Sequence, residues 1–518
     1  MTGQSNRLAW FALMSAGLGF AVLQAIAYAH AGVFEYPLDD VYIHLAMAEG
    51  IGRGTYGVNP GVPASASSSI LWPLLLVPWP GTGVQRMLPL MLNFLALLGC
   101  GWAWGRSVML GGFSGFVGVA LAVFGPLALN MPGVAFTGME NSTHALVSLL
   151  IVLGLWRFLT QGTIGVWFAA ALIVSPLIRL EGLALSLLVV AVMWMRGRGR
   201  AALPIGVAIV APVAGFALFL TALGLDPLPG SVLAKMELVG HGLGPVAKAV
   251  ATFWNNLQTL PGLLLAALTL TFGLLPVLSG RLRRAPAGVM LAVLSAAGLA
   301  HLLFARIGWM HRYEHYILVA QMAGLMLCAP AIGAAQPLGR RLVRRFAGLA
   351  LIAAAVGYWP ALFVNYLWNP RAIHLQQAQM ARFVHDFFKA PVAVNDLGWV
   401  SWNNDRFVLD LWGLGSQEVR HIFFAPEPPP QGWADALVKE HDVRAALIYD
   451  SWFLPAIGPD WVRLGGLTMD GNWGVLGGWE VSFYATTAEA APELREAMRA
   501  FAPTLPPDAH LSIDGAGS

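Results

Sequence analysis

The segment LAWFALMSAGLGFAVLQAIAYAH, residues 8–30, decides the class of this protein. It carries no acidic side chain, no lysine and no arginine, and about 20 apolar residues are what an α-helix needs to cross roughly 30 Å of hydrocarbon. Similar segments recur as far as residue 367. The chain is 57% hydrophobic and 11% charged, with a mean hydropathy of +0.65, whereas about 25% of the residues in soluble domains are charged. The composition predicts a polytopic α-helical membrane protein and excludes an ordinary soluble enzyme.

The first apolar segment and the two cysteines indicate whether a cleaved signal peptide, disulfides or a metal site are to be expected. The segment lacks the small-residue cleavage site of a signal peptide and is followed by many more spans, so we expect it to be an uncleaved first helix. Cys100 and Cys328 lie inside apolar runs. They predict neither a disulfide framework nor a metal site.

Arginine clusters orient the predicted spans. By the positive-inside rule these clusters are cytoplasmic, and the acids before residue 369 lie between them, so all of these acids can face outward. We expect about eleven transmembrane helices, starting near residues 8, 85, 112, 141, 163, 181, 201, 258, 286, 312 and 346, with the N-terminus cytoplasmic. Residues 67–80 are expected to form a re-entrant or interfacial helix. The arginines are Arg106, Arg157, Arg196, Arg198, Arg200, Arg281, Arg283, Arg284, Arg340, Arg341, Arg344 and Arg345, and the acids are Glu35, Asp39, Asp40, Glu49, Glu140, Glu181, Asp226, Glu237 and Glu314.

The composition changes after residue 368. The last 150 residues hold 18 of the 27 acids and 10 of the 30 basic residues, a net charge of −8. Short apolar runs at 392–396, 407–411 and 445–450 predict buried strands, and residues 376–388 predict a helix. We therefore expect a transmembrane domain at 1–368 with an outer-face loop at 31–80, and an extracytoplasmic soluble α/β domain at 369–518. The eight tryptophans of the latter can stack on sugars or pack in its core. Asp396, Asp405 and Asp410 are expected to cap turns and strand ends rather than to perform chemistry.

The stretch EYPLDDVYIHLAMAEGIGRGTYGVNPG, residues 35–61, gathers carboxylates in a region nearly free of charge. Residues 40–51 have the spacing of a short helix at the outer membrane surface, on which Asp40 and His44 share a face. Desolvation beside the bilayer raises the proton affinity of a carboxylate, so Asp39 or Asp40 can serve as general base for a hydroxyl. The alternative is that both acids cap the helix start. Arg53 and Arg86 are expected to contact lipid headgroups.

Several segments, taken in order, resemble one family. The DD pair, GRGTYGVNPG and SASSSILWPLLL (65–76) resemble the first extracytoplasmic loop of GT-C fold glycosyltransferases that use polyprenyl-phosphate sugars. The likeness is greatest to mycobacterial cell-wall arabinofuranosyltransferases, and more distant to protein O-mannosyltransferases and lipid A aminoarabinose transferases. Further similar segments are TGMENSTHALVSLLIVLGL (137–155), SPLIRLEGLAL (175–185), DPLPGSVLAK (226–235), HRYEHYILV (311–319) and NDLGWVSWNNDRFVLDLWGL (395–414).

The chain also departs from the family pattern at a few positions. The family usually shows Thr at Asn141, Pro at Leu180, and Asn-Thr at Gly230 and Ser231. These departures leave the GT-C assignment in place and the sugar and acceptor unassigned.

The resemblance implies an inverting glycosyltransferase. It would move a sugar, such as arabinofuranose or another pentose or hexose, from a polyprenyl-phosphate donor to a hydroxyl of a cell-envelope glycan, lipid or protein at the outer face of the cell membrane. In family terms the leading Asp of the first loop is the base, so Asp39 is expected in that role with Asp40 as its competitor. His44 would orient the base or bind phosphate, unless it only reaches toward the membrane interface.

Candidates for the donor phosphate are the cations on the predicted outer side. Lys235, His311 and Arg312 lie there, and Arg binds phosphate through two hydrogen bonds while Lys acts as a point charge. The alternative for HRYEHY (311–316) is an interfacial belt of aromatic and charged groups.

Candidates for acceptor binding are three charged residues, Glu140, Glu181 and Arg179. The alternatives are an acid that favours a helix start at Glu140 and a local ion pair between Arg179 and Glu181. No compact ligand cluster is visible, so no obligatory metal or other cofactor is expected, although paired acids and a phosphate are compatible with a divalent cation.

Two other function classes compete with the enzyme. A lipid or oligosaccharide transporter would place ionisable groups near the midplane of several helices, often in repeated halves. A non-catalytic membrane scaffold would tolerate neutralisation of both aspartates. The expected partners are the lipid-linked donor, the acceptor and membrane lipids, and no nucleic acid.

Overall fold

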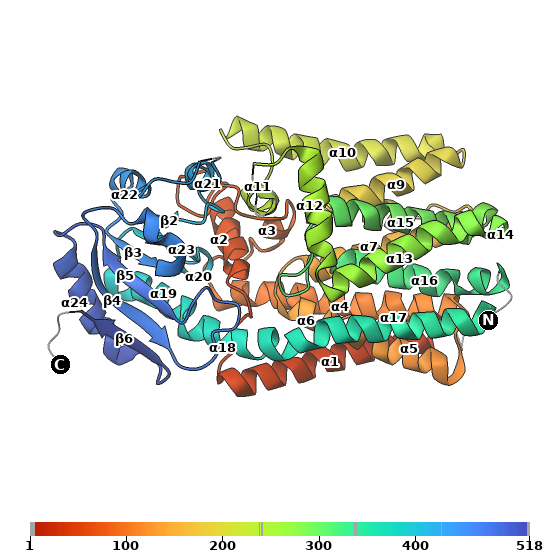
Figure 1. Cartoon of the computed structure of the whole chain (residues 1–518), viewed down its shortest axis with the longest axis horizontal. Coiled ribbons are helices and arrows are strands. Elements are labelled where there is room, and N and C mark those ends of the chain that lie inside the picture. The colour runs from red at the N-terminus through yellow and green to blue at the C-terminus, as the bar shows by residue number, and fades with distance from the viewer. Residues whose placement is uncertain (1–5, 238, 240–241, 336–338, 426, 515–518) are drawn as a thin grey trace. The chain divides into compact units, whose positions relative to one another are not determined.

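The computed structural model describes residues 6–237, 239, 242–335, 339–425 and 427–514 (Figure 1). The chain forms two compact units. Unit 1 comprises residues 1–24, 90–215 and 243–362, and unit 2 comprises 25–89, 216–242 and 363–518. Residues 25–89 and 216–242 thus pack with the C-terminal part of the chain, so unit 2 is more than the water-facing domain that composition alone outlines.

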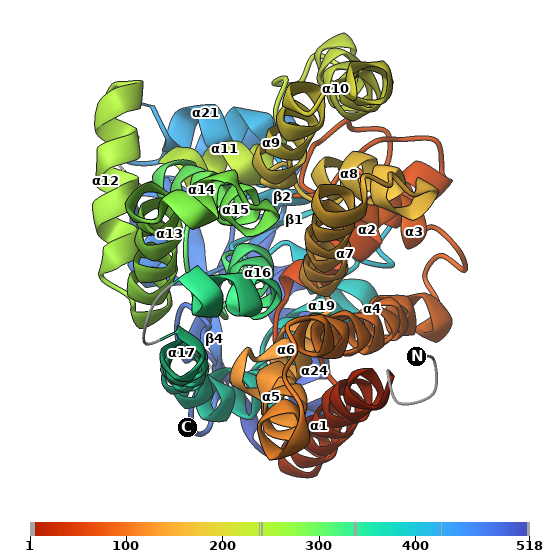
Figure 2. The same cartoon turned by 90° about the vertical axis from the view of Figure 1, so that its right-hand side faces the viewer.

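Unit 1 is built from apolar α-helices. Figure 2 looks along several of them, with α7, α13, α15 and α16 seen nearly end-on. The helices that lie wholly or largely in unit 1 are α1 (Arg7–Ala31), α4 (Gly83–Leu110), α5 (Gly115–Ala128), α6 (Met131–Phe136), α7 (Asn141–Gln161), α8 (Val166–Ile178), α9 (Gly182–Met195), α10 (Gly199–Ala222), α12 (Pro245–Leu257), α13 (Leu260–Leu278), α14 (Gly280–Arg284), α15 (Pro286–Phe304), α16 (His315–Ala335) and α17 (Gly339–Ala361).

The membrane-spanning class is borne out by these helices. In the described part of the chain, nine helical stretches are long and apolar enough to cross a membrane, and α8 and α9 are shorter apolar helices. Each predicted start lies near the beginning of one of these helices, apart from residue 346, which lies inside α17. The number of crossings stays a prediction.

The acids Glu140 and Glu314 and the arginine cluster of α14 lie at opposite ends of unit 1. The side chain of Asn141, at the start of α7, donates to the backbone oxygen of Arg312, just before α16. Glu140 and Glu314 therefore lie at the same end of the helices. The arginines of α14 follow the end of α13, at the opposite end of unit 1 (Figure 1). Such a separation is what the positive-inside rule requires, while the side of the membrane on which each end lies stays a prediction.

Unit 2 contains a six-stranded mixed sheet in the order β2-β1-β3-β5-β4-β6. Strand β1 pairs in parallel with β2 and β3, with Ala393 opposite Leu409 and Ala446, and the remaining pairs are antiparallel. The three strands predicted from apolar runs are confirmed. The strands are β1 (Val392–Val394), β2 (Val408–Asp410), β3 (Ala445–Ile448), β4 (Val462–Met469), β5 (Glu480–Ala485) and β6 (Ala509–Ile513).

Helices complete unit 2 around a buried apolar core that includes Leu409, Val419, Ala446 and Phe453. They are α2 (Asp40–Gly52), α3 (Trp72–Leu75), α11 (Gly230–Glu237), α18 (Trp368–Leu375), α19 (Gln377–Arg382), α20 (Gly398–Ser401), α21 (Gln417–Phe423), α22 (Asp435–Glu440), α23 (Asp450–Phe453) and α24 (Ala491–Phe501), with π-helices at Leu362–Tyr366 and Phe383–Phe388 and 3₁₀ turns at Leu454–Ala456 and Ala502–Thr504.

Helix α2 forms as predicted, but its expected position at a membrane surface is wrong. Every residue from Val41 to Glu49 is buried, because α2 packs against α3 and α20 within unit 2. A helix with apolar residues on all sides is stable when it is enclosed by protein rather than when one face meets water. Within residues 67–80 the helix is confined to α3, and Ser67, Ser68 and Ser69 before it are buried.

Candidate active site

The carboxylate of Asp39 is held by backbone amides from a distant part of unit 2. Its two oxygens accept hydrogen bonds from the N–H of Gly398 at 2.7 Å and of Trp399 at 2.9 Å. These amides belong to the first turn of α20, where backbone N–H groups have no partner within the helix. A Cβ atom on Gly398 would lie 2.2 Å from the backbone oxygen of Asp39. Position 398 therefore has to be glycine for this contact to form.

Two further carboxylates surround Asp39. Burial, and then the charge of Asp396, raises the pKa of Asp39 well above its usual value, and Asp40 acts in the same direction. Burial also raises the pKa of Asp396 to about 6, against the opposing hydrogen bond from Gln377 and with the help of Asp40. Asp40 and Asp396 are partly exposed, whereas Asp39 is buried. Unit 2 thus holds three mutually repelling carboxylates, and the proton affinity of Asp39 and Asp396 is enhanced.

Asp396 was expected from the sequence only to cap a strand end, and the structure places it beside Asp39. It lies after β1, and its Oδ2 accepts hydrogen bonds from Gln377 Nε2 at 2.8 Å and from the Tyr449 hydroxyl at 3.4 Å. A functional role for Asp396 could have been inferred from its position directly after a predicted strand, because the ends of parallel strands form ligand sites in α/β folds. The expectation that an aspartate caps a turn or strand end is confirmed for Asp410. Its carboxylate accepts the N–H of Trp412 at 2.9 Å and of Gly415 at 2.7 Å.

Aromatic rings and one buried ion pair support the site. The Tyr42 ring stacks on Trp399 with centroids 4.1 Å apart. The guanidinium of Arg86 pairs with Glu35 at 2.9 Å and lies over the Trp399 ring at 5.0 Å. The expectation that Arg86 contacts lipid headgroups is therefore not met, because its charge is compensated inside unit 2.

Arg53, the other residue expected at headgroups, also has a protein partner. Its guanidinium pairs with Asp405 at 2.7 Å, and both side chains are exposed. An exposed pair of this kind stabilises a protein by about 0–1 kcal/mol.

His44 lies one helical turn after Asp40 on α2, but its ring contacts a different segment. Its Nδ1 is 3.0 Å from the hydroxyl of Ser67. The side chain is buried, so the alternative of a histidine reaching toward the membrane interface is wrong.

The predicted phosphate ligands are divided between the two units. Lys235 is on α11 in unit 2, whereas His311 and Arg312 precede α16 in unit 1. The Arg312 guanidinium is buried above the ring of Tyr313, 5.2 Å from its centroid. His311 Nδ1 is 3.7 Å from a carboxylate oxygen of Glu314.

The predicted acceptor-binding residues come together in unit 1. The Arg179 guanidinium bridges Glu140 and Glu181, with both N–O distances 2.6 Å. The predicted local pair between Arg179 and Glu181 is thereby confirmed, and Glu140 joins it from the start of α7. Although burial opposes ionisation, Arg179 lowers the pKa of Glu181 to about 2. The charge of Arg179 therefore favours the ionised form of Glu181.

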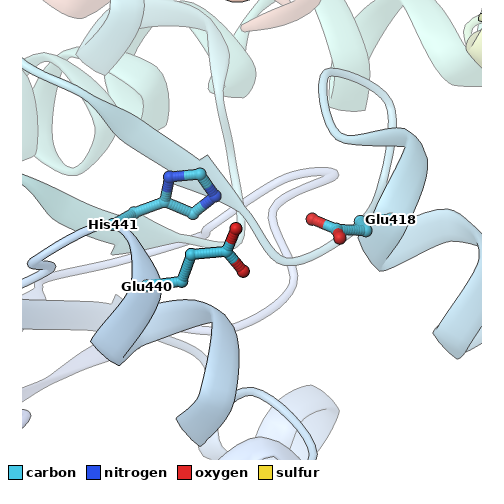
Figure 3. A group of neighbouring side chains, drawn as sticks. All are labelled: Glu418, Glu440 and His441. Carbon is cyan, nitrogen blue, oxygen red and sulfur yellow. The ribbon is translucent and has the colours of Figure 1, made fainter. Parts of the chain in front are cut away.

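One group with the composition of a metal site lies elsewhere on unit 2. In the part of the chain that the structure describes, only Glu418, Glu440 and His441 bring three potential ligand atoms within 4.8 Å of one another (Figure 3). The glutamates are exposed, and the His441 ring stacks on Phe407 with centroids 4.2 Å apart. A surface cluster of acids of this kind does not by itself assign a metal.

One protein family is similar to the C-terminal part of this chain, and one solved structure is similar to most of it. The model of a family described as "Domain of unknown function (DUF8728)" matches residues 368–497, beginning where the composition changes. No curated protein matches the chain. Among solved structures, the crystal structure of ArnT from Cupriavidus metallidurans in the apo state is similar, with 16% identity and a TM-score of 0.45 over 92% of this chain and 98% of that chain.

ArnT is a lipid A aminoarabinose transferase of GT-C type, one of the groups that the sequence resembles. At 16% identity and this TM-score, the similarity assigns neither a donor nor an acceptor. Any reaction has to be argued from the side chains of the two units.

Proposed function

We propose that this protein is an inverting glycosyltransferase of the cell membrane that uses a polyprenyl-phosphate sugar. The observation that supports the proposal best is the carboxylate of Asp39, positioned by the amides of Gly398 and Trp399 and given a raised pKa by burial and by Asp396. A positioned carboxylate of raised proton affinity is what general-base activation of a hydroxyl requires.

The reaction would proceed in one displacement. Asp39 accepts the proton of an acceptor hydroxyl while the oxygen attacks the anomeric carbon, and the bond from that carbon to the phosphate oxygen breaks with its electron pair leaving on the phosphate. A single base is enough for inversion, whereas retention would need a nucleophile as well. Asp40 is the competing base, because it is more exposed and its charge acts on both other carboxylates.

The other predicted residues keep their roles as part of this proposal. Lys235, which belongs to the same unit as Asp39, would stabilise the phosphate that leaves. His311 and Arg312 as phosphate ligands, and Glu140, Glu181 and Arg179 as acceptor ligands, stay predictions from the family resemblance, and no obligatory metal is proposed. The N-terminus would be cytoplasmic and residues 369–518 extracytoplasmic, where a cell-envelope glycan, lipid or protein supplies the hydroxyl.

Transport and scaffolding are the competing functions. Asp39, Asp40 and Asp396 lie outside the candidate membrane-spanning helices, whereas transport sites lie near the midplane of the bilayer. A scaffold has no need for three neighbouring carboxylates, since their repulsion destabilises the fold.

The test is sugar transfer by purified wild type, Asp39→Asn and Asp40→Asn from a panel of polyprenyl-phosphate pentoses and hexoses. Asp405→Asn is the matched control, because that carboxylate is exposed. We expect wild type and the control to consume one donor, and Asp39→Asn to lose activity at least about 100-fold while thermal melting shows that the variant is folded. Loss in Asp40→Asn alone would move the base to Asp40. Full activity of both variants would refute the proposal.

A further inference from the structure

Helix α12 lies at the end of unit 1 that carries Glu314, at the level where two candidate spans begin and end. Candidate span α13 begins at Leu260, directly after the last turn of α12. The side chain of Asn256, on that turn, is buried, and its Nδ2 donates to the backbone oxygens of Leu302 at 3.0 Å and of Ala305 at 2.8 Å. These oxygens lie at the C-terminal end of α15, another candidate span. Asn256 therefore holds α12 at the boundary of the apolar region.

The direction of α12 differs from that of the spans. It runs across the ends of α13 and α15 rather than along them (Figure 1). In Figure 2, which looks along these spans, α12 is visible over most of its length at the edge of unit 1. Its 13 residues reach about 20 Å at 1.5 Å per residue, whereas a crossing requires roughly 30 Å. Helix α12 is therefore not a span, and no span of the described chain fills the space beneath most of its length.

One side of α12 exposes large apolar side chains. Val246, Val250 and Trp254 are 78%, 49% and 63% exposed. Because they are spaced by four residues, they form a single apolar ridge along the helix. Asn255 follows Val246 by about 2.5 turns, so it lies on the opposite side, where it is also exposed. Lys248, the single charged residue of α12, lies on the same side as Asn255.

We propose that α12 lies flat in the lipid surface at this end of unit 1, with the apolar ridge among the acyl chains and Asn255 in the headgroup layer. A short helix with a tryptophan on its apolar face and a lysine on its polar face is the type that binds a bilayer surface in this orientation. The partner is lipid rather than another protein chain, because α13 and α15, which hold α12, are themselves candidate spans with lipid around them. The inference involves neither donor nor acceptor, so its outcome does not bear on the proposed glycosyltransferase.

Spin labelling of the full-length protein in nanodiscs of equal parts phosphatidylcholine and phosphatidylglycerol tests the position of α12. The native Cys100 and Cys328, both buried, are replaced by alanine, and each ridge residue and Asn255 in turn is replaced by a labelled cysteine. Collision rates with oxygen, which concentrates in the acyl chains, and with a water-soluble nickel chelate report the depth of each label. Leu270→Cys, on the exposed face of α13, is the lipid control, and Val462→Cys, exposed on β4, is the water control.

We expect the three ridge labels to collide several-fold more often with oxygen than with the chelate, at depths of about 5–10 Å below the headgroup boundary, and Asn255→Cys to be accessible to the chelate. Ridge labels as accessible to the chelate as Val462→Cys would place the ridge in water. Low collision rates with both reagents would show that protein covers the ridge, and a label at Asn255 as deep as the ridge would show that α12 is immersed. Each of these three results would overturn the inference. Thermal melting identifies any labelled variant that is not folded, and the three ridge positions keep the test decisive if one of them fails.

Discussion

Replacement of Asp396 by asparagine tests whether the three carboxylates of unit 2 repel one another as the structure indicates. Burial and the charge of Asp40 raise the pKa of Asp396 from 3.8 to about 6, despite the hydrogen bond from Gln377. The folded protein therefore holds this proton more tightly than the unfolded chain. The resulting contribution to stability is fully present below about pH 4 and is lost as the pH rises through about 6.

The size of the effect follows from the shift in pKa. A shift from 3.8 to about 6 corresponds to about 3 kcal/mol, at about 1.4 kcal/mol per unit. Asparagine has nearly the same shape, and its side-chain oxygen can still accept the hydrogen bond from Gln377. We expect Asp396→Asn to be more stable than wild type by about 2–3 kcal/mol at pH 7.5, by about 1 kcal/mol at pH 4.5, and to show little difference below about pH 4. For a unit of this size the gain corresponds to about 5 °C in melting temperature.

The assay is thermal unfolding of both proteins in the same nanodiscs at several values between pH 4.5 and 8. Asp405→Asn is the control, because its carboxylate is 83% exposed and its removal should change little. A second readout is the acid limb of kcat/KM, which should move to lower pH in Asp396→Asn because a negative neighbour of Asp39 has been removed. A melting temperature of Asp396→Asn at or below that of wild type at pH 7.5 would refute the reasoning.

Two further substitutions test the contacts that position the charged groups. In Gly398→Ala, the new Cβ would lie 2.2 Å from the backbone oxygen of Asp39, so we expect kcat to fall about 100-fold. The control is Gly83→Ala, which should be nearly neutral because no atom lies within 4 Å of its new Cβ. Equal kcat values in the two variants would contradict this prediction. Arg179→Met should destabilise the protein by about 3–5 kcal/mol, because it leaves the buried carboxylate of Glu140 without its guanidinium. Thermal melting measures this loss of stability. Adding Glu140→Gln to Arg179→Met should restore part of the lost stability. A double variant no more stable than Arg179→Met alone would count against the ion pair.

Much of unit 1 could be predicted because the signals are local. The run at 8–30 and the later apolar runs are recognisable by hydropathy, and the helix starts predicted near residues 141, 181 and 286 agree with the structure. The pair of Arg179 and Glu181 was also within reach, since the two residues are close in sequence. Glu140 was recognised as a candidate, but its bond to Arg179 joins residues 39 positions apart, and no local pattern specifies that distance.

The location of α2 shows why local patterns were not enough in unit 2. Its hydrophobic spacing was compatible with a surface helix, and only the neighbouring α3 and α20 reveal that both sides are covered. For Arg86, the sequence position beside a span suggested headgroups, whereas the partner that compensates its charge, Glu35, is 51 residues away. Burial and pairing are properties of the packed unit, so they are not encoded in the type of a single residue.

The sequence by itself determined that this is a multi-pass membrane protein with an α/β segment after residue 368, because hydropathy and charge are carried by each stretch of chain independently. It also singled out Asp39 and Asp40 as unusual acids in an apolar context. Only the tertiary structure decided what holds Asp39, since the amide of Gly398 lies 359 positions away, and that Asp396 shares its surroundings. The physical reason is that a proton affinity depends on burial and neighbouring charges, which exist only once distant segments have been packed together.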